Sequence, residues 1–219
     1  MLEIHGVFGA GGYGREVMPL ARMQLLNLKK RLDNLYFVVD NPEMEEVNGA
    51  KVISLTDFIR IDAEKKYLSI AVGNGMFRAS LQSRMQDHNI IDWTVIAENC
   101  VIMDEVTIGL GSILSPFVTI TSNVTIGSSF HANLYSYVAH DCVIGDFVTF
   151  APGVQCNGNV VIKNHAYIGS GAIIRNGQSG KPLIIGESSV IGMGSVVTKD
   201  VPPGVTVFGN PAKSIKRTV

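Results

Sequence analysis

The chain has 219 residues, of which 46% are hydrophobic and only 17% are charged, and its formal net charge at pH 7 is −1. A chain this apolar is neither a disordered chain nor a solvated, highly charged coil. A net charge this small argues against nucleic-acid or membrane-surface binding driven by bulk electrostatics.

The charge deficit is concentrated in the middle of the chain, where Asp141 and Asp146 are the only formally charged residues between Val106 and Ile162. Polar residues interrupt this stretch every few positions, so it is not a membrane-spanning helix. The three cysteines of the chain are too few and too scattered for a disulfide scaffold or a zinc site. We therefore expect a protein of the reducing cytoplasm.

Up to residue 93, strand-like and helix-like runs alternate. Apolar spacing predicts strands at 2–8, 35–39 and 67–72, and helices after the first strand and at 77–89. The first strand begins at once without a basic leader, so we expect no signal peptide. Alternating β and α elements predict a parallel sheet with helices packed on it. Residues 1–93 are therefore expected to form a small, Rossmann-like α/β domain.

A glycine-rich turn joins the first strand to the first helix, and Gly9, Gly11 and Gly14 match the spacing G-x-G-x-x-G. Glycines let a phosphate approach the backbone, and a helix N-terminus favours its negative charge. Asp40 follows the second strand, where a carboxylate can bind a ribose. Two alternatives stay open from these residues alone. One is a tight turn with no ligand, and the other is a nicotinamide dinucleotide, although 93 residues hold only about one mononucleotide-binding half.

From residue 94 onward the sequence follows a period of six, and every sixth residue from Ile96 to Ile174 is apolar. This period fits neither a helix nor a simple strand. It is typical of a parallel β-helix, in which three hexapeptides make one coil of about 18 residues. We expect about five to six such coils, with a loop leaving one corner at 176–183, where the period slips. Cys142 and Cys156 fall at inward or corner positions, which predicts buried hydrophobes rather than an acyl-cysteine.

Among the five histidines, His140 is distinctive because it lies next to Asp141 in the stretch with almost no charge. A carboxylate beside an imidazole orients the ring and supports proton uptake, so His140 is a candidate general base. The alternative is a structural histidine on a coil face. A zinc site is not expected, since the coil positions of His131, His140 and His165 do not coincide within one chain.

Together these features resemble the hexapeptide-repeat acyltransferases. Within them, the chain resembles the group that acetylates nucleotide-linked amino sugars, alongside the sialic-acid O-acetyltransferase-like enzymes. The segments that carry the resemblance are 9–14, 39–41, 71–74 with Arg78, Asn133, 138–145, 158–160, 196–204 and 209–213. The resemblance implies a left-handed parallel β-helix over residues 94–219, a homotrimer, acetyl-CoA as co-substrate and no metal.

The resemblance also implies roles for individual residues. His140 would be the general base beside Asp141, and the backbone N–H of Gly158 would stabilise the oxyanion. The residues implied to bind the nucleotide-linked sugar are Gly9, Gly11, Gly12, Tyr13, Gly14, Asp40, Asn41, Gly73, Asn74 and Asn133. Those implied to contact CoA are Gly158, Ile168, Gly169, Lys199, Pro211 and Lys213, with Lys216 and Arg217 extending a basic end. Thr149 departs from the family pattern, which has a second histidine at that position.

We therefore expect an acetyl-CoA-dependent acetyltransferase of surface-polysaccharide biosynthesis. Its acceptor would be the C4 amino group of a UDP- or dTDP-linked amino-dideoxy sugar, which His140 would deprotonate as the nitrogen attacks the thioester directly. Two alternatives stay open: an O-acetyltransferase that acts on a sialic acid or another surface-glycan hydroxyl, and a non-catalytic binding trimer. Neither a nucleic acid nor a membrane is an expected partner.

Overall fold

The computed structural model describes residues 2–215, and its internal contacts divide the chain into two compact units. The first unit comprises Met1–Glu98 with Leu110–Ile113, and the second comprises Asn99–Gly109 with Leu114–Val219. The sequence period changes after residue 93, inside the first unit. The domain limits 1–93 and 94–219 stay a prediction, because contacts alone do not test which segments fold independently.

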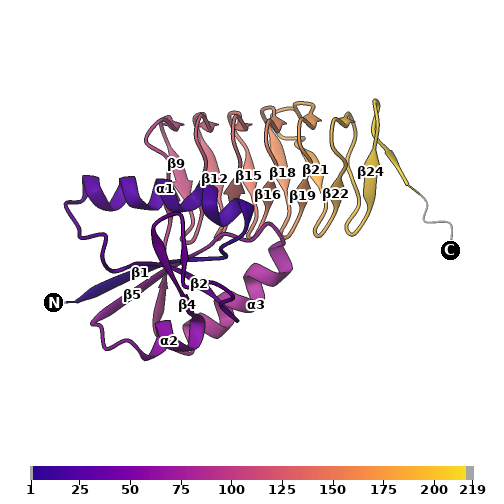
Figure 1. The fold of residues 1–219 in the computed structure, drawn as a ribbon. Helices are drawn as coiled ribbons and strands as arrows, with labels where there is room; N and C mark the ends of the chain where they lie inside the picture. Colours follow the sequence, from indigo (N-terminus) through magenta and orange to yellow (C-terminus); the bar gives the residue numbers. More distant parts are fainter. Residues whose placement is uncertain (1, 216–219) are drawn as a thin grey trace. The chain divides into compact units, whose positions relative to one another are not determined.

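The first unit is a six-stranded sheet with the strand order β3-β4-β2-β1-β5-β6. Its strands are β1 (Glu3–Phe8), β2 (Leu35–Val39), β3 (Glu46–Val47), β4 (Ala50–Ser54), β5 (Lys65–Ile70) and β6 (Ile90–Asp92). Its helices are α1 (Gly12–Asn27), α2 (Leu55–Arg60) and α3 (Gly75–Gln86) (Figure 1). The central strand β1 pairs in parallel with β2 and β5, whereas β3 and β4 form an antiparallel hairpin. This is the expected parallel α/β fold.

Helices cover both faces of this sheet because successive side chains of a strand point to opposite sides. Ile4 of β1 belongs to a buried cluster with Phe58 of α2 and Leu81 of α3. Val7 of the same strand belongs to a second cluster with Val17 of α1. The sheet is therefore the middle of three layers within this unit.

Short elements were not anticipated from the sequence. The two-residue strand β3 and the six-residue helix α2 are too short to show a clear hydrophobic period. The strand β4 is as long as β2, but Lys51 and Ser54 interrupt its apolar residues, whereas β2 is a continuous apolar run. Helix α3 begins two residues before the expected start, because Oδ1 of Asn74 accepts a hydrogen bond from the Phe77 amide at 3.0 Å and caps the helix.

From β7 onward, short strands stack into three sheets, the faces of a left-handed parallel β-helix (Figure 1). Face 1 contains β7 (Val95–Ile96), β10 (Ile113–Leu114), β13 (His131–Ala132), β16 (Thr149–Phe150), β19 (Tyr167–Ile168), β22 (Val190–Ile191), β24 (Thr206–Phe208) and β25 (Lys213–Ser214). Face 2 contains β8 (Val101–Ile102), β11 (Thr119–Ile120), β14 (Tyr137–Val138), β17 (Gln155–Cys156), β20 (Ile173–Ile174) and β23 (Val196–Val197). Face 3 contains β9 (Val106–Ile108), β12 (Val124–Ile126), β15 (Val143–Ile144), β18 (Val160–Ile162) and β21 (Leu183–Ile185).

The strand register confirms the 18-residue coil. Along face 2, Ile120 pairs with Val138, which pairs with Cys156, which pairs with Ile174. All four side chains are fully buried inside the prism. The first of the expected inward residues differ, since Ile102 is 41% exposed and Ile96 and Ile108 are only partly buried. All three lie in the first coil, which no earlier coil covers.

The expected corner loop is also confirmed. On face 3, β18 pairs with β21 so that Ile162 lies opposite Ile185. The sequence separation of these two residues is larger than the length of one regular coil. Residues 175–182 between β20 and β21 leave the coil and make up the difference. None of the helices in residues 2–215 is long and apolar enough to cross a membrane.

Candidate active site

His140 and Asp141 lie at the corner between face 2 and face 3, directly after β14. Asp141 adopts the left-handed conformation with φ 59°, which Asp tolerates better than most residues. This turn places Oδ2 of Asp141 2.7 Å from Nδ1 of His140. Nδ1 is thereby held as the donor to the carboxylate, so Nε2 carries the free lone pair. The His140 side chain is 61% exposed, which leaves Nε2 accessible to a substrate.

Gly158 lies directly under the imidazole, one coil further on. A methyl group on its α-carbon would come within 2.6 Å of both Cε1 and Nε2 of His140, so any larger side chain would push the ring away. The two residues are fixed by the ladder, because the Asn159 amide donates to the His140 carbonyl at 3.0 Å. Within residues 2–215, the Gly158 amide donates to no backbone or side-chain acceptor. The His140 imidazole, a candidate base, and the Gly158 amide, a hydrogen-bond donor, therefore lie next to each other at this edge.

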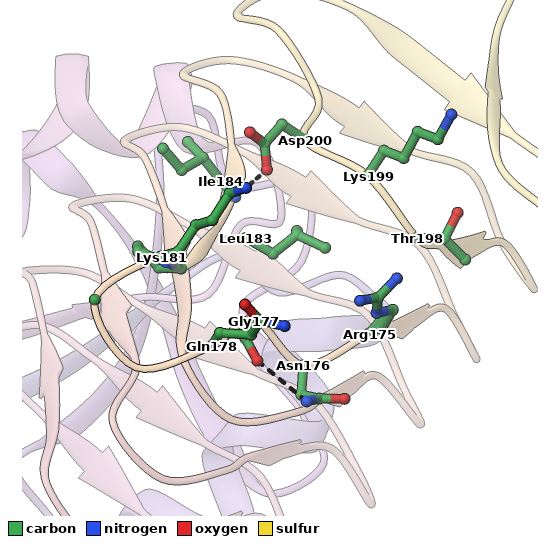
Figure 2. Close-up of a pocket in the computed structure, with 12 residues that line it drawn as sticks. Arg175, Asn176, Gly177, Gln178, Lys181, Leu183, Ile184, Thr198, Lys199 and Asp200 are labelled. Carbon is green, nitrogen blue, oxygen red and sulfur yellow. Dashed lines mark hydrogen bonds between the residues drawn. The ribbon is translucent and has the colours of Figure 1, made fainter.

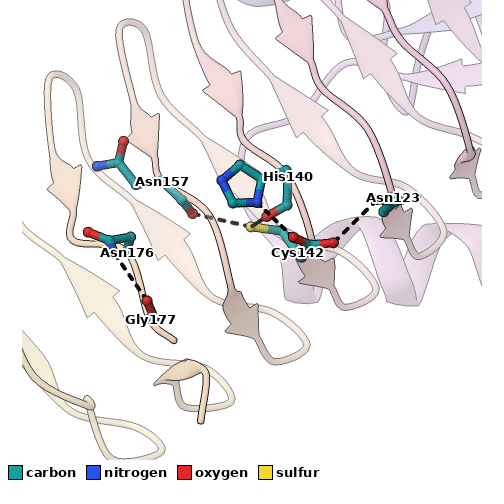
Figure 3. Close-up of polar contacts among 7 residues, drawn as sticks. Asn123, His140, Cys142, Asn157, Asn176 and Gly177 are labelled. Atoms are coloured by element: carbon teal, nitrogen blue, oxygen red, sulfur yellow. Dashed lines mark hydrogen bonds and ion pairs between the residues drawn. The ribbon is translucent and has the colours of Figure 1, made fainter. Parts of the chain in front are cut away.

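Sequence reasoning missed Asn123, which occupies the same corner one coil before Asp141. Its Nδ2 donates to Oδ1 of Asp141 at 3.4 Å, while the other oxygen of the carboxylate holds His140 (Figure 3). Both Asn123 and Asp141 have a φ of 59°. The sequence could have predicted this contact, because residues separated by one full coil stack on each other and Asn123 precedes Asp141 by one coil.

The buried neighbours of this corner are structural. Cys142 and Cys156 are at most 1% exposed, as expected for small core residues. Sγ of Cys142 donates to the Asn157 carbonyl at 3.2 Å. The hydrogen bond between Cys156 and Cys142, in which the Cys156 thiol keeps its proton, together with burial raises the pKa of that thiol well above its ordinary value. Neither thiol is placed to act as a nucleophile.

A pocket of about 560 Å³ opens on the same edge, at the coils that follow Gly158 (Figure 2). Its lining comes from the corner loop and from the turn after β23. It includes three cations, Arg175, Lys181 and Lys199. Its one carboxylate, that of Asp200, is outnumbered by these cations, and its Oδ1 accepts a hydrogen bond from the Ile184 amide at 2.9 Å. The pocket therefore favours an anionic ligand.

Other residues predicted to contact CoA lie elsewhere. Pro211 and Lys213 are exposed in the terminal β24–β25 hairpin, where Lys213 pairs with Phe208. Ile168 is fully buried, so only its backbone can reach a ligand. Lys216 and Arg217 lie outside the described residues.

The structure divides the predicted residues of the β-helix between two edges. Asn133 and Gly169 follow β13 and β19, at the edge between face 1 and face 2, whereas His140 and Gly158 lie at the edge between face 2 and face 3. Nδ2 of Asn133 donates to the Phe150 carbonyl at 2.7 Å. A single chain therefore does not bring Asn133 and His140 to one point. Thr149 is only 3% exposed, on face 1.

In the first unit, the glycine turn has the geometry of a phosphate-binding turn. Gly9 has a φ of 107°, and a methyl group on Gly14 would come within 1.8 Å of the Gly9 carbonyl oxygen. Helix α1 begins at Gly12, and its N-cap Gly11 supplies no side-chain oxygen to the first-turn amides. A helix N-terminus of this kind favours an anion. The ring of Tyr13 packs against the hydrophobic core on the α1 side.

The other residues predicted to bind the nucleotide follow neighbouring strands. Phe8 of β1 pairs with Val38 of β2 and with Ile70 of β5, so the turn, the Asp40–Asn41 segment and the Gly73–Asn74 segment share one sheet edge. Oδ1 of Asp40 accepts a hydrogen bond from Arg84 at 3.2 Å, and its side chain is 45% exposed.

Arg78 lies under the same edge and is fully buried. Its Nη1 donates to the Val72 carbonyl at 2.9 Å, which fixes the start of the Gly73–Asn74 segment. Burial lowers its pKa to about 10, so it remains a cation at neutral pH.

Comparison with known proteins identifies the family of the chain. Residues 6–85 match the family described as the PglD N-terminal domain. GDP-perosamine N-acetyltransferase of Escherichia coli O157:H7 is 48% identical over 217 residues, which covers 99% of this chain and 98% of that protein.

Two solved structures are similar over nearly the whole chain. WeeI from Acinetobacter baumannii AYE is 51% identical with a TM-score of 0.94, and the match covers 98% of this chain and 100% of that one. The acetyltransferase domain of PglB from Neisseria gonorrhoeae FA1090, solved in complex with acetyl coenzyme A, is 28% identical with a TM-score of 0.85, covering 96% and 98%. With its α/β unit, its hexapeptide coil and these full-length matches, the chain belongs to the hexapeptide-repeat acetyltransferases that act on nucleotide-linked amino sugars.

Proposed function

We propose that the protein transfers an acetyl group from acetyl-CoA to the amino group, at C4, of a GDP-linked amino-dideoxy sugar. The choice of GDP rests on the relative named GDP-perosamine N-acetyltransferase, which is 48% identical and matches end to end. It replaces the UDP- or dTDP-sugar expected from the sequence as the first substrate to test. The cytoplasmic setting expected from the cysteines agrees with this choice, since nucleotide sugars and acetyl-CoA are made there.

The observation that carries the proposal is the placement of the His140 imidazole on Gly158. An amino sugar at neutral pH is largely an ammonium ion, which has no lone pair for attack. Once this ammonium has lost one proton to water, Nε2 of His140 removes a second proton as the nitrogen attacks the thioester carbonyl, and the Asp141 carboxylate stabilises the resulting imidazolium. The Gly158 amide donates to the oxyanion that develops on the carbonyl oxygen. When the C–S bond breaks, the CoA thiolate takes the proton from His140, which restores the base.

The cationic pocket lined by Arg175, Lys181 and Lys199 is the proposed binding site for the CoA phosphates. It lies on the same edge as His140 and Gly158, and three of its lining residues carry a positive charge. Lys199, predicted as a CoA contact, is one of them. When the thioester of acetyl-CoA lies at Gly158, the CoA phosphates would then lie near the corner loop. The residues present fit an anionic cofactor of this kind.

The division of predicted residues between two edges supports a shared active site. In a homotrimer, the edge of one copy that carries Asn133 and Gly169 would face the His140 edge of the next copy. The site would then be completed only by assembly, which supports the homotrimer that the resemblance implies.

A thiol-release assay tests the function. The protein, with acetyl-CoA and a GDP-linked 4-amino sugar, should release CoA and yield an N-acetylated product by mass spectrometry. Turnover of the His140→Ala variant should fall at least about 100-fold, the size of a general-base effect. His88→Ala, on an exposed surface position of the first unit, is the matched control. Near-normal turnover in a folded His140→Ala protein, or acetylation only of sugar hydroxyls, would contradict the proposal.

A further inference from the structure

A second pocket, of about 230 Å³, lies in the first unit beside the glycine turn. Its walls are mostly aliphatic and come from the end of β2 and from the β3–β4 hairpin, with Val39, Val47 and Val52 among them. Val47 and Val52 are less than a tenth exposed, so they form a firm apolar floor. Such a floor suits a flat, aromatic ring.

The pocket lies where the base of a nucleotide would be if its phosphates bound at the glycine turn. Ala10 and Gly11, which precede helix α1, form one side of it. Asp40, which is placed to bind a ribose, directly follows the lining residue Val39. A nucleoside diphosphate with its phosphates at the α1 N-terminus and its ribose at Asp40 therefore directs its base toward this pocket.

Glu43 is the only charged residue among those that line the pocket. Its carboxylate has two acceptor oxygens and no donor. Guanine presents two neighbouring donors on one edge, N1–H and the N2 amino group, which match a carboxylate bidentately. Uracil and thymine present a single N3–H between two carbonyl oxygens, which repel a carboxylate. Adenine presents no N1–H.

We propose that Glu43 selects guanine among nucleotide-sugar bases, by accepting hydrogen bonds from N1–H and the N2 amino group while the valine floor supports the ring. This inference rests on the proposed function, since it takes the nucleotide site to be at the glycine turn. It adds a residue that the sequence did not single out. It also gives a structural reason for a GDP-linked rather than a UDP- or dTDP-linked substrate.

Isothermal titration of the full chain with GDP, IDP, UDP and dTDP tests the proposal. IDP lacks only the N2 amino group, so the wild-type protein should bind GDP about tenfold more tightly than IDP, the value of one charge-assisted hydrogen bond. In Glu43→Gln, the amide oxygen can accept a hydrogen bond from only one of the two guanine donors. The NH2 group of the glutamine would face the other guanine donor, and two donors cannot form a hydrogen bond. The GDP-to-IDP ratio should therefore fall toward one, and GDP should bind at least about tenfold more weakly.

Glu45→Gln is the matched control. Glu45 lies on the same exposed segment but does not line the pocket, so this variant should keep the wild-type ratio. Since Glu43 is exposed, its substitution should leave the thermal unfolding midpoint unchanged.

The outcomes separate the two proposals. If the wild type acetylates GDP-linked sugars and Glu43→Gln keeps the full GDP-to-IDP ratio, Glu43 does not read the base and the proposed function stands. If the wild type acetylates only UDP- or dTDP-linked sugars, the choice of GDP and the role of Glu43 both fail, whereas the acetyl transfer itself stands.

Discussion

The imidazole of His140 rests on the α-carbon of Gly158, so closely that a single methyl group there would meet Cε1 and Nε2 at 2.6 Å. The two residues are one coil apart, and the β-helix ladder holds their backbones in register. The position of the base therefore depends on the absence of a side chain at residue 158. The same glycine supplies the amide proposed to stabilise the oxyanion.

Gly158→Ala should lower the turnover number about 10- to 100-fold, because the added methyl group displaces the imidazole from the reacting nitrogen. Steady-state kinetics with saturating acetyl-CoA measure this effect. Gly194→Ala is the control, since a methyl group at Gly194 meets nothing within 4 Å, although its φ of 65° makes the change mildly destabilising. Equal turnover losses in the two variants would show that the contact with His140 has no catalytic role.

Asp141→Asn should lower kcat/KM about 100-fold, because a neutral amide no longer stabilises the imidazolium or fixes its tautomer. Asn123→Ala should cost less, about three- to tenfold, since it only loosens the carboxylate that it contacts. Asn123 acts through Asp141, so the double variant should be no worse than Asp141→Asn alone. Additive losses in this double-mutant cycle, read from kcat/KM, would refute that role.

Lys181→Ala and Lys199→Ala should each raise the KM for acetyl-CoA several-fold and leave kcat within about twofold, because both line the cationic pocket away from the reacting atoms. The effect should shrink in 0.5 M salt, where charge attraction is screened. Lys51→Ala, at an exposed position of the first unit, is the control. An unchanged KM for acetyl-CoA in both variants would place the phosphates elsewhere.

Mixing two inactive variants tests the shared site. His140→Ala and Asn133→Ala alter different edges of the coil. If neighbouring copies build one site from these two edges, subunit exchange between the variants should regenerate some intact sites and restore a measurable fraction of wild-type turnover. Light scattering should give the mass of a trimer for each. No recovery from verified mixed trimers would mean that each chain carries its own complete site.

His5 should make the first unit sensitive to acid. It is buried, stacks on Tyr67 at 4.8 Å, and burial lowers its pKa to about 4. In the unfolded chain its pKa is about 6.5. Below that pH, the unfolded chain binds a proton that the folded chain does not, so the free energy of unfolding should fall by about 2 kcal/mol between pH 7 and pH 5. Above about pH 7.5, where the imidazole is unprotonated in both the folded and the unfolded chain, His5 contributes no pH dependence.

Urea denaturation at the two pH values measures this difference. His5→Phe keeps an aromatic ring in the stack without a titrating group, so it should lose most of the difference. His88→Gln, at an exposed position, should keep it. A His5→Phe protein that remains as acid-sensitive as the wild type would assign the effect to other groups.

The sequence by itself determined the repeating parts of the molecule. The six-residue period predicted the coil, its inward side chains and the loop at one corner, because each coil must bury the same kind of residue at the same position. The pair His140–Asp141 was visible because the two residues are adjacent. The strand and the helix around the glycine turn were visible because both are long enough to show their own period.

Only the tertiary structure decided what meets across coils and across loops. The contact of Asn123 with Asp141, the fit of His140 on Gly158 and the separation of Asn133 from His140 depend on the stacking register and on which face each strand joins. Glu43 lies on a short segment with no period, so only the folding of β3 and β4 against β2 brings it to a pocket. Local patterns predict elements, whereas sites form between residues whose neighbours are set by packing.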